Sequence, residues 1–228
     1  MFKSITRTWN VFKGCKHDCV YCCARSLAET RLKNSPRYRD GFEPHFIEEE
    51  LQSSFRPNEF IFVAFMGDIA FATREEYLRI LARIRQFPET WFLIQSKNPR
   101  QLYDWWADWG IGVPNNVYLG TTIETNRDYA TLRNKAPAPI DRFRYLAGYP
   151  HSLKFLSIEP IMDFDVDELL HWVKLMQPSI VEVGADNYHN HLPEPSWRKV
   201  QELLREAREI CPRVVEKDGL ERLKEANS

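Results

Sequence analysis

Apolar and polar positions alternate along the chain in a regular order of strand and helix patterns. Short, nearly continuous apolar runs end in small or polar residues, as expected for parallel strands that are covered on both faces. Five runs of this kind occupy residues 60–68, 91–97, 117–124, 154–160 and 180–186. They predict five buried strands.

Amphipathic patterns lie between these runs and after the last one. They predict helices over residues 73–87, 98–109, 165–176 and 195–210. Thr73 followed by Glu76, and Asp165 followed by Glu168, have the spacing of helix starts. The chain therefore alternates strand and helix over most of its length.

This alternation predicts the fold class. A sixth strand is predicted over residues 6–13, whereas residues 214–219 fit either a short strand or a loop. A strand and a helix repeated every 25 to 40 residues, roughly, are typical of a parallel β/α barrel or a doubly wound sheet. The length of 228 residues favours one α/β domain spanning residues 1–228.

Polar side chains recur where the predicted strands end. In both parallel architectures, ligands bind at the carboxyl ends of the strands. A single Asp or Ser at such a position is most often a cap or a turn former. Recurrence at every strand end favours a ligand site instead, and the residues concerned are Asp68, Ser96, Lys97, Thr121, Thr122, Glu124, Glu159, Asp186 and Asn187.

Charge and hydropathy exclude some classes of protein. The formal net charge of -1 excludes the global basic excess of a protein that coats nucleic acid. Residues 1–42 nevertheless carry nine basic groups against three acidic ones, a local charge of +6. This excess fits either a solvated surface or a phosphate-bearing partner. The first ten residues lack the apolar core of a signal peptide, and the longest apolar run is too short for a bilayer, so we expect a cytoplasmic protein without membrane contact.

Four of the five cysteines lie within residues 14–23. In a reducing compartment, an odd number of clustered cysteines favours metal binding or catalysis over disulfides. Cys15, Cys19 and Cys22 have the spacing C-x3-C-x2-C, which suits a four-iron, four-sulfur cluster with one open iron. Structural zinc normally takes four ligands, and Cys23 or His17 is available as the fourth. A zinc-stabilised binding module without catalysis is therefore the alternative.

The cysteine motif resembles a known family. With Tyr21 as its aromatic residue, it matches the signature of the radical S-adenosylmethionine (SAM) superfamily. Met66-Gly67-Asp68 resembles the motif, usually Gly-Gly-Glu, that binds the amino group of SAM, although Met66 and Asp68 depart from it. A phage-associated, uncharacterised branch of the superfamily, and more remotely spore photoproduct lyase, resemble the chain over residues 8–15, 65–68, 94–102, 117–125, 154–161 and 181–187.

The resemblance implies a partial (β/α)6 barrel of the TIM type and a radical mechanism. Cys15, Cys19 and Cys22 would ligate a [4Fe-4S] cluster whose fourth iron is chelated by SAM, whereas Cys23 would point elsewhere. Reduction of the cluster would then cleave SAM to a 5′-deoxyadenosyl radical, which takes hydrogen from the substrate. A reductant protein of the flavodoxin or ferredoxin type would be the electron donor.

The resemblance also implies roles for the remaining candidates. Each candidate also has a simpler structural role in packing, capping or turn formation. The expected SAM-binding residues are Tyr21 near the adenine and Met66, Gly67 and Asp68 at the methionine end, together with Lys97. Ser96, Thr122 and Glu124 are expected at the ribose hydroxyls or the substrate. The expected catalytic residues, which would face the substrate, are Glu124, Glu159 and Asp186.

The expected substrate is a modified nucleobase or nucleoside, presented free or in DNA. The local charge of +6 and the phage-associated resemblance support it, and a peptide or amino acid is the alternative. If phosphates are bound, Arg25, Arg31 and Arg37 are the expected contacts.

Overall fold

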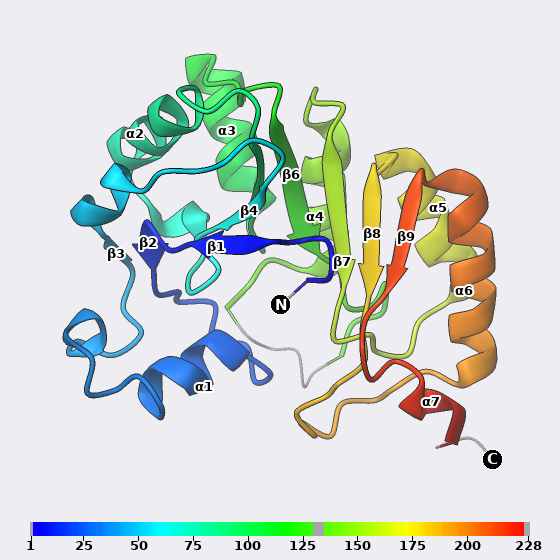
Figure 1. Cartoon of the computed structure of the whole chain (residues 1–228). Coiled ribbons are helices and arrows are strands. Elements are labelled where there is room, and N and C mark those ends of the chain that lie inside the picture. Colours follow the sequence, from blue (N-terminus) through cyan, green and yellow to red (C-terminus); the bar gives the residue numbers. More distant parts are fainter. Residues whose placement is uncertain (1, 130–134, 226–228) are drawn as a thin grey trace.

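A curled sheet of seven parallel strands forms the centre of the structure, a computed structural model that describes residues 2–129 and 135–225. Each strand pairs in parallel with its neighbours, and the sheet closes only part of a barrel (Figure 1). In spatial order the strands are β1 (Arg7–Trp9), β4 (Phe60–Val63), β5 (Trp91–Gln95), β6 (Val117–Thr122), β7 (Lys154–Ile158), β8 (Ile180–Val183) and β9 (Arg213–Glu216).

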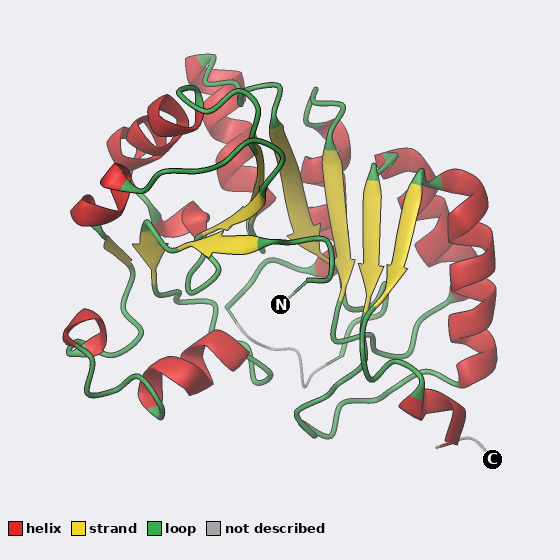
Figure 2. Cartoon of the chain, viewed as in Figure 1, coloured by secondary structure: helices red, strands yellow, loops and turns green. Residues whose placement is uncertain are grey.

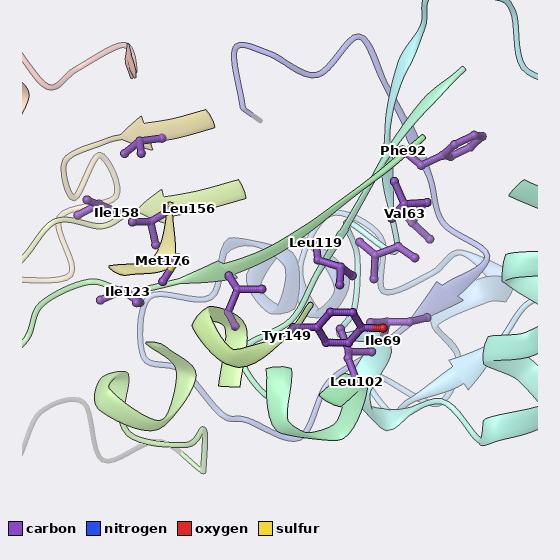
Figure 3. Close-up of a cluster of buried hydrophobic side chains, with 14 of the residues drawn as sticks. Val63, Ile69, Phe92, Leu102, Leu119, Ile123, Tyr149, Leu156, Ile158 and Met176 are labelled. Carbon is purple, nitrogen blue, oxygen red and sulfur yellow. The ribbon is translucent and has the colours of Figure 1, made fainter. Parts of the chain in front are cut away.

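Five helices follow strands of this sheet and cover its outer face. They are α2 (Arg74–Ile84), α3 (Pro99–Trp109), α4 (Pro139–Gly148), α5 (Val166–Met176) and α6 (Trp197–Ile210). Alternate strand residues point toward the helices, and Leu119 of β6 and Leu156 of β7 belong to the main hydrophobic cluster with Leu102 of α3 (Figure 3). The intervening residues, such as Phe155 of β7, face the hollow side of the sheet and belong to a second cluster.

The predicted fold class is confirmed, and residues 213–216 add a seventh strand at the open edge. The prediction of one strand over residues 6–13 is wrong. Only β1 joins the main sheet, because the chain turns away after Trp9: Asn10 Oδ1 accepts the Met66 amide at 3.0 Å. Beyond this turn, β2 (Phe12–Lys13) pairs antiparallel with β3 (His45–Phe46).

All four predicted helices are present, and the two predicted helix starts differ in detail. Thr73 and Glu76 form a reciprocal capping box before α2. Asp165 precedes α5, but its side chain bonds to Arg127 instead of capping the helix. The apolar patterns did not reveal α1 (Cys23–Glu29), α4 or α7 (Arg222–Glu225).

The carboxyl ends of the strands converge on one edge of the molecule. Figure 2 shows the arrowheads of β6 to β9 pointing toward this edge, where α1 and the loops after β7 and β8 also lie. Within residues 2–129 and 135–225, no helix is both long and apolar enough to span a bilayer. The strand ends therefore define where a site has to be sought.

Candidate active site

The cysteine loop connects β2 to α1 and is fixed to the end of β4. The Gly14 amide donates to the Met66 carbonyl at 2.8 Å, and the Asp68 amide donates to the Gly14 carbonyl at 3.1 Å. A Cβ atom on Gly67 would lie 2.8 Å from the Gly14 oxygen, so only glycine allows this close approach of the two backbones. Gly67 thereby places the cysteine loop against the sheet.

A cavity of about 360 Å³ opens at the carboxyl ends of the strands. Its volume lies in the range of about 300–1,000 Å³ that is common for small-molecule sites. Eleven of the thirteen residues expected to bind the cluster, SAM or the substrate line it: Cys15, Cys19, Tyr21, Cys22, Gly67, Asp68, Ser96, Lys97, Thr122, Glu159 and Asp186. Met66 and Glu124 do not line it.

The three motif cysteines share one wall of the cavity. Cys15 Sγ accepts the His17 amide and Cys22 Sγ accepts the Arg25 amide, each at 3.4 Å. Burial raises the pKa of all three thiols above the ordinary value, so the free thiols stay protonated at neutral pH. A metal centre that displaces these protons is the usual way to hold buried cysteines as thiolates.

For Cys23, the expectation that it points away from the cluster stays a prediction. This cysteine is the first residue of α1 and lines the same cavity as the other three cysteines. Cys211, by contrast, is buried in the main hydrophobic cluster, as expected for a small apolar residue.

Asp68 is buried at the end of β4 and accepts several hydrogen bonds. Oδ1 accepts the Ser96 hydroxyl at 2.6 Å and the Ala70 amide at 3.0 Å, while Oδ2 accepts the Lys97 amide at 2.9 Å. His17 Nε2 lies 3.1 Å from Oδ2. Burial opposes the charge, but these donors outweigh it and lower the pKa of Asp68. Asp68 therefore orders the loop after β5 and the imidazole of the cysteine loop.

Glu124 lies behind the cavity wall in a fully buried charge cluster. Its carboxylate accepts Arg142 Nη1 at 2.8 Å and the Tyr21 hydroxyl at 2.5 Å, and it pairs with Lys97 Nζ. Burial alone would raise its pKa, but the charges of Arg142 and Lys97 outweigh burial and hold the pKa at about 2. Glu124 thus fixes the side chains of Tyr21 and Lys97, which do face the cavity.

Another part of the cavity wall comes from the last three strands. Glu159 follows β7 and pairs with Lys217, which follows β9. Asp186 accepts the side-chain amide of Asn190 at 2.6 Å and the backbone amide of Tyr188 at 3.3 Å, so it also shapes its own loop. These residues and the cysteine loop line the same cavity.

Met66 does not line the cavity. Its side chain is 5% exposed and packs with Ala24, Ala28, Tyr38 and Phe42 beneath α1. Its contribution to the site described above is the backbone carbonyl that accepts the Gly14 amide.

The sequence interpretation missed several residues of the site. Gln95 and Ser157 occupy inward strand positions, a signal that the alternation of the strands already carries. Lys217 would have been predicted if residues 214–219 had been assigned to a strand. Arg142 and Phe2 gave no local signal, because only the tertiary structure brings them to the site.

Comparison with known proteins places the chain in a family. A family model described as "Protein of unknown function (DUF5131)" matches residues 3–199. The chain belongs to the DUF5131 family. No curated protein matches its sequence.

The DUF5131 chain is similar in fold to solved structures of spore photoproduct lyase. A double mutant of that enzyme with bound AdoMet and dinucleoside spore photoproduct matches with a TM-score of 0.53 and 12% identity, over 87% of this chain and 60% of that one. Another structure, of the lyase complexed with dinucleoside spore photoproduct, gives a TM-score of 0.53 and 10% identity over the same shares. The DUF5131 chain thus spans 60% of the length of the structures it resembles.

Proposed function

We propose that this DUF5131 protein is a radical SAM enzyme. The observation that carries the proposal is that Cys15, Cys19 and Cys22 line one cavity at the carboxyl ends of a parallel half-barrel. Three thiols on a short loop fit a [4Fe-4S] cluster with one iron left for SAM. When bound, the cluster supplies the electron that cleaves SAM into methionine and a 5′-deoxyadenosyl radical, which removes hydrogen from a substrate.

The protein's own residues bind and orient the reactants in this proposal. Tyr21 offers an aromatic wall beside the cysteines, and its ring is fixed by the hydroxyl bond to Glu124. Ser96, Lys97 and Thr122 face the cavity as candidate contacts for SAM. Asp68 and Glu124 become positioning residues, because their carboxylates already accept bonds from the surrounding chain.

The proposed substrate is a nucleobase or nucleoside, free or within a nucleic acid. The aromatic side chains in the cavity wall suit a planar ring, and Glu159 and Asp186, which line the same cavity, would orient it. The similar solved structures hold a dinucleoside ligand, which supports the same class. A peptide or amino acid is the alternative substrate.

The experiment that tests the function is anaerobic reconstitution followed by reduction with SAM present. We expect the protein to bind about four iron and four sulfide per chain, as one cubane cluster requires, and to release 5′-deoxyadenosine slowly without a substrate. Cys15→Ala, Cys19→Ala and Cys22→Ala should each lose the iron, whereas Cys23→Ala and the matched control Cys211→Ala should keep it. A protein with an intact cluster that neither binds nor cleaves SAM would contradict the proposal.

A zinc site is the second candidate, because one group of side chains favours it. Ligand atoms of Cys15, His17 and Asp68 lie within 4.8 Å of one another. Stoichiometric zinc without sulfide, lost in both His17→Ala and Cys15→Ala, would support this candidate. The same metal analysis therefore separates the two functions.

A further inference from the structure

The hollow face of the half-barrel is covered by residues 2–5. Phe60 and Phe62 of β4, Leu93 of β5, Phe155 of β7 and Ile180 of β8 all face this side and are at most 8% exposed. Two of the residues that bury them, Phe2 and Ile5, come from outside the sheet. Figure 1 shows this part of the chain lying across the sheet in front of β6 and β7 before it enters β1.

A buried carboxylate holds this segment in place. Glu182 points inward from β8 with 0% of its surface exposed. Its two oxygens accept the backbone amides of Lys3 at 2.9 Å and Ser4 at 2.8 Å. No basic side chain among the described residues lies within ion-pair distance of Glu182. A buried carboxylate is costly unless it is hydrogen-bonded, so these two amides account for its presence.

The segment is also fixed where it enters the sheet. The Thr6 amide donates to the Phe60 carbonyl at 2.9 Å, and the Phe60 amide donates to Thr6 Oγ1 at 2.9 Å. Residues 3 to 6 are thus tied to β8 at one end and to β4 at the other. This segment spans the hollow of the half-barrel, and its hydrogen bonds fix the position of the neighbouring Phe2.

Phe2 forms part of the cavity wall. Its ring lies 5.4 Å from that of Phe62 and 5.0 Å from that of Phe155, between centroids. Lys217, which pairs with Glu159, places its Nζ 4.6 Å from the centroid of the Phe2 ring. Phe2 and Lys217 both line the cavity that holds the cysteines.

We propose that Phe2 is a specificity-determining residue that forms the floor of the substrate cavity, held at its depth by Glu182. The floor closes off the apolar space between Phe62 and Phe155, so a substrate group enters only as far as the Phe2 ring and the Lys217 ammonium that lies over it. A compact planar group fits this end of the cavity, and a longer apolar chain is excluded. The inference rests on the proposed function only in naming the cavity the substrate site.

We call the two hydrogen bonds from the Lys3 and Ser4 amides to Glu182 the tether. It is tested by amide hydrogen exchange, measured by NMR on the full chain without cluster or SAM. In Glu182→Ala, the amides of Lys3 and Ser4 should exchange at least tenfold faster than in the wild type. Glu216→Ala is the matched control, because Glu216 lies on the adjacent strand β9 and pairs with Arg208 at the surface. Unchanged protection of residues 3 and 4 in a folded Glu182→Ala would overturn the tether. If Glu182→Ala does not fold, Glu182→Gln keeps one acceptor, and faster exchange at only one of the two amides is expected.

The floor is tested with benzene as the probe. Phe2→Ala should open an apolar hollow, and benzene should then show nuclear Overhauser contacts to the methyl groups of Leu93 and Ile180 that the wild type lacks. Phe143→Ala is the control, because Phe143 is also 8% exposed but packs on the outer face against Trp172. Benzene bound in that variant should show no contact to the Leu93 and Ile180 methyls.

The proposal that Phe2 forms the floor would be wrong if benzene gave equal nuclear Overhauser contacts to these methyls in the wild type, or none in a folded Phe2→Ala. If Phe2→Ala does not fold, Phe2→Leu with xenon as the probe tests the smaller hollow. Xenon bound equally in the wild type, or not bound in Phe2→Leu, would then contradict the proposal. Neither measurement needs iron or SAM, so a negative result removes the floor without affecting the proposed function. Failure to bind a cluster would remove the function and leave these results standing.

Discussion

At the residue scale, Glu124 and Arg142 form a buried ion pair whose partners are at most 1% exposed in their side chains. Removing one partner of a buried pair costs about 3–5 kcal/mol, and loss of Arg142 would leave Lys97 as the remaining ion-pair partner of Glu124 among the described residues. We therefore expect Arg142→Met to lower the free energy of unfolding by this amount in urea denaturation. Arg144→Met on the same helix should change it by less than about 0.5 kcal/mol, since Arg144 is 68% exposed in its side chain. Equal losses in the two variants would refute the role of the pair.

A separate prediction at the residue scale concerns Gly67. A Cβ atom there would meet backbone atoms of the cysteine loop, which cannot move as a flexible side chain can. Gly67→Ala should cost about 1–3 kcal/mol by overpacking and should reduce iron uptake, because the loop loses its place against β4. Gly112→Ala is the control, since a Cβ atom at Gly112 meets nothing within 4 Å. Wild-type iron content in Gly67→Ala would show that the close approach is dispensable.

At the scale of elements, α2 and α5 begin with similar sequences but different contacts. The Thr73 hydroxyl accepts the Glu76 amide at 3.2 Å, whereas the Asp165 carboxylate accepts Arg127 Nε at 3.0 Å. Thr73→Ala should therefore cost about 1 kcal/mol through loss of the cap, largely independent of salt. Asp165→Ala should cost less than about 1 kcal/mol, and this cost should shrink at high salt, because it removes an exposed ion pair.

Urea denaturation of Thr73→Ala and Asp165→Ala at low and high salt measures how the loss in the free energy of unfolding depends on salt. A strongly salt-dependent loss in Thr73→Ala would contradict the capping interpretation. Both helices were predicted from the same spacing, and only the neighbouring element decides which contact the first side chain makes.

At the scale of the whole molecule, the basic excess of residues 1–42 is partly neutralised by folding. Lys3, Arg7, Lys16 and Arg37 pair with Asp218, Glu59, Glu43 and Glu50, which all lie outside that segment. Arg25 pairs with Asp18 and also donates to the Cys15 carbonyl at 3.2 Å. Within the described chain, Arg31, Lys33 and Arg39 stay exposed and make no ion pair, so the surface for phosphates is smaller than the count suggests.

This distribution predicts which basic residues act on a nucleic acid. If a short oligothymidylate binds, its affinity should fall with salt, and Arg31→Ala and Lys33→Ala should each reduce the logarithmic salt slope by about 0.7. Arg37→Ala should change the slope less, because Arg37 is held by Glu50 at 2.7 Å. Lys174→Ala, on the outer helix α5, is the control, and salt-independent binding would argue against phosphate contacts.

The sequence by itself determined the five strands β4 to β8, four of the helices and the members of the cysteine loop. These are local properties, because burial on both faces of a parallel strand and the spacing of C-x3-C-x2-C are written in consecutive residues. Eleven expected site residues meet in one cavity because parallel strands bring their carboxyl ends to one edge. The pattern alone left open the choice between a parallel β/α barrel and a doubly wound sheet.

The tertiary structure decided what depends on residues far apart in the chain. Glu124 became a buried charge only beside Arg142, and Glu182 became a tether only because residues 3 and 4 lie against β8. No local pattern predicts such pairs, since the free energy of burying a charge depends on the partner that folding supplies. The sequence showed which polar residues follow the strands. It did not show which of them face the cavity and which hold other side chains in place, because that depends on partners far away in the chain.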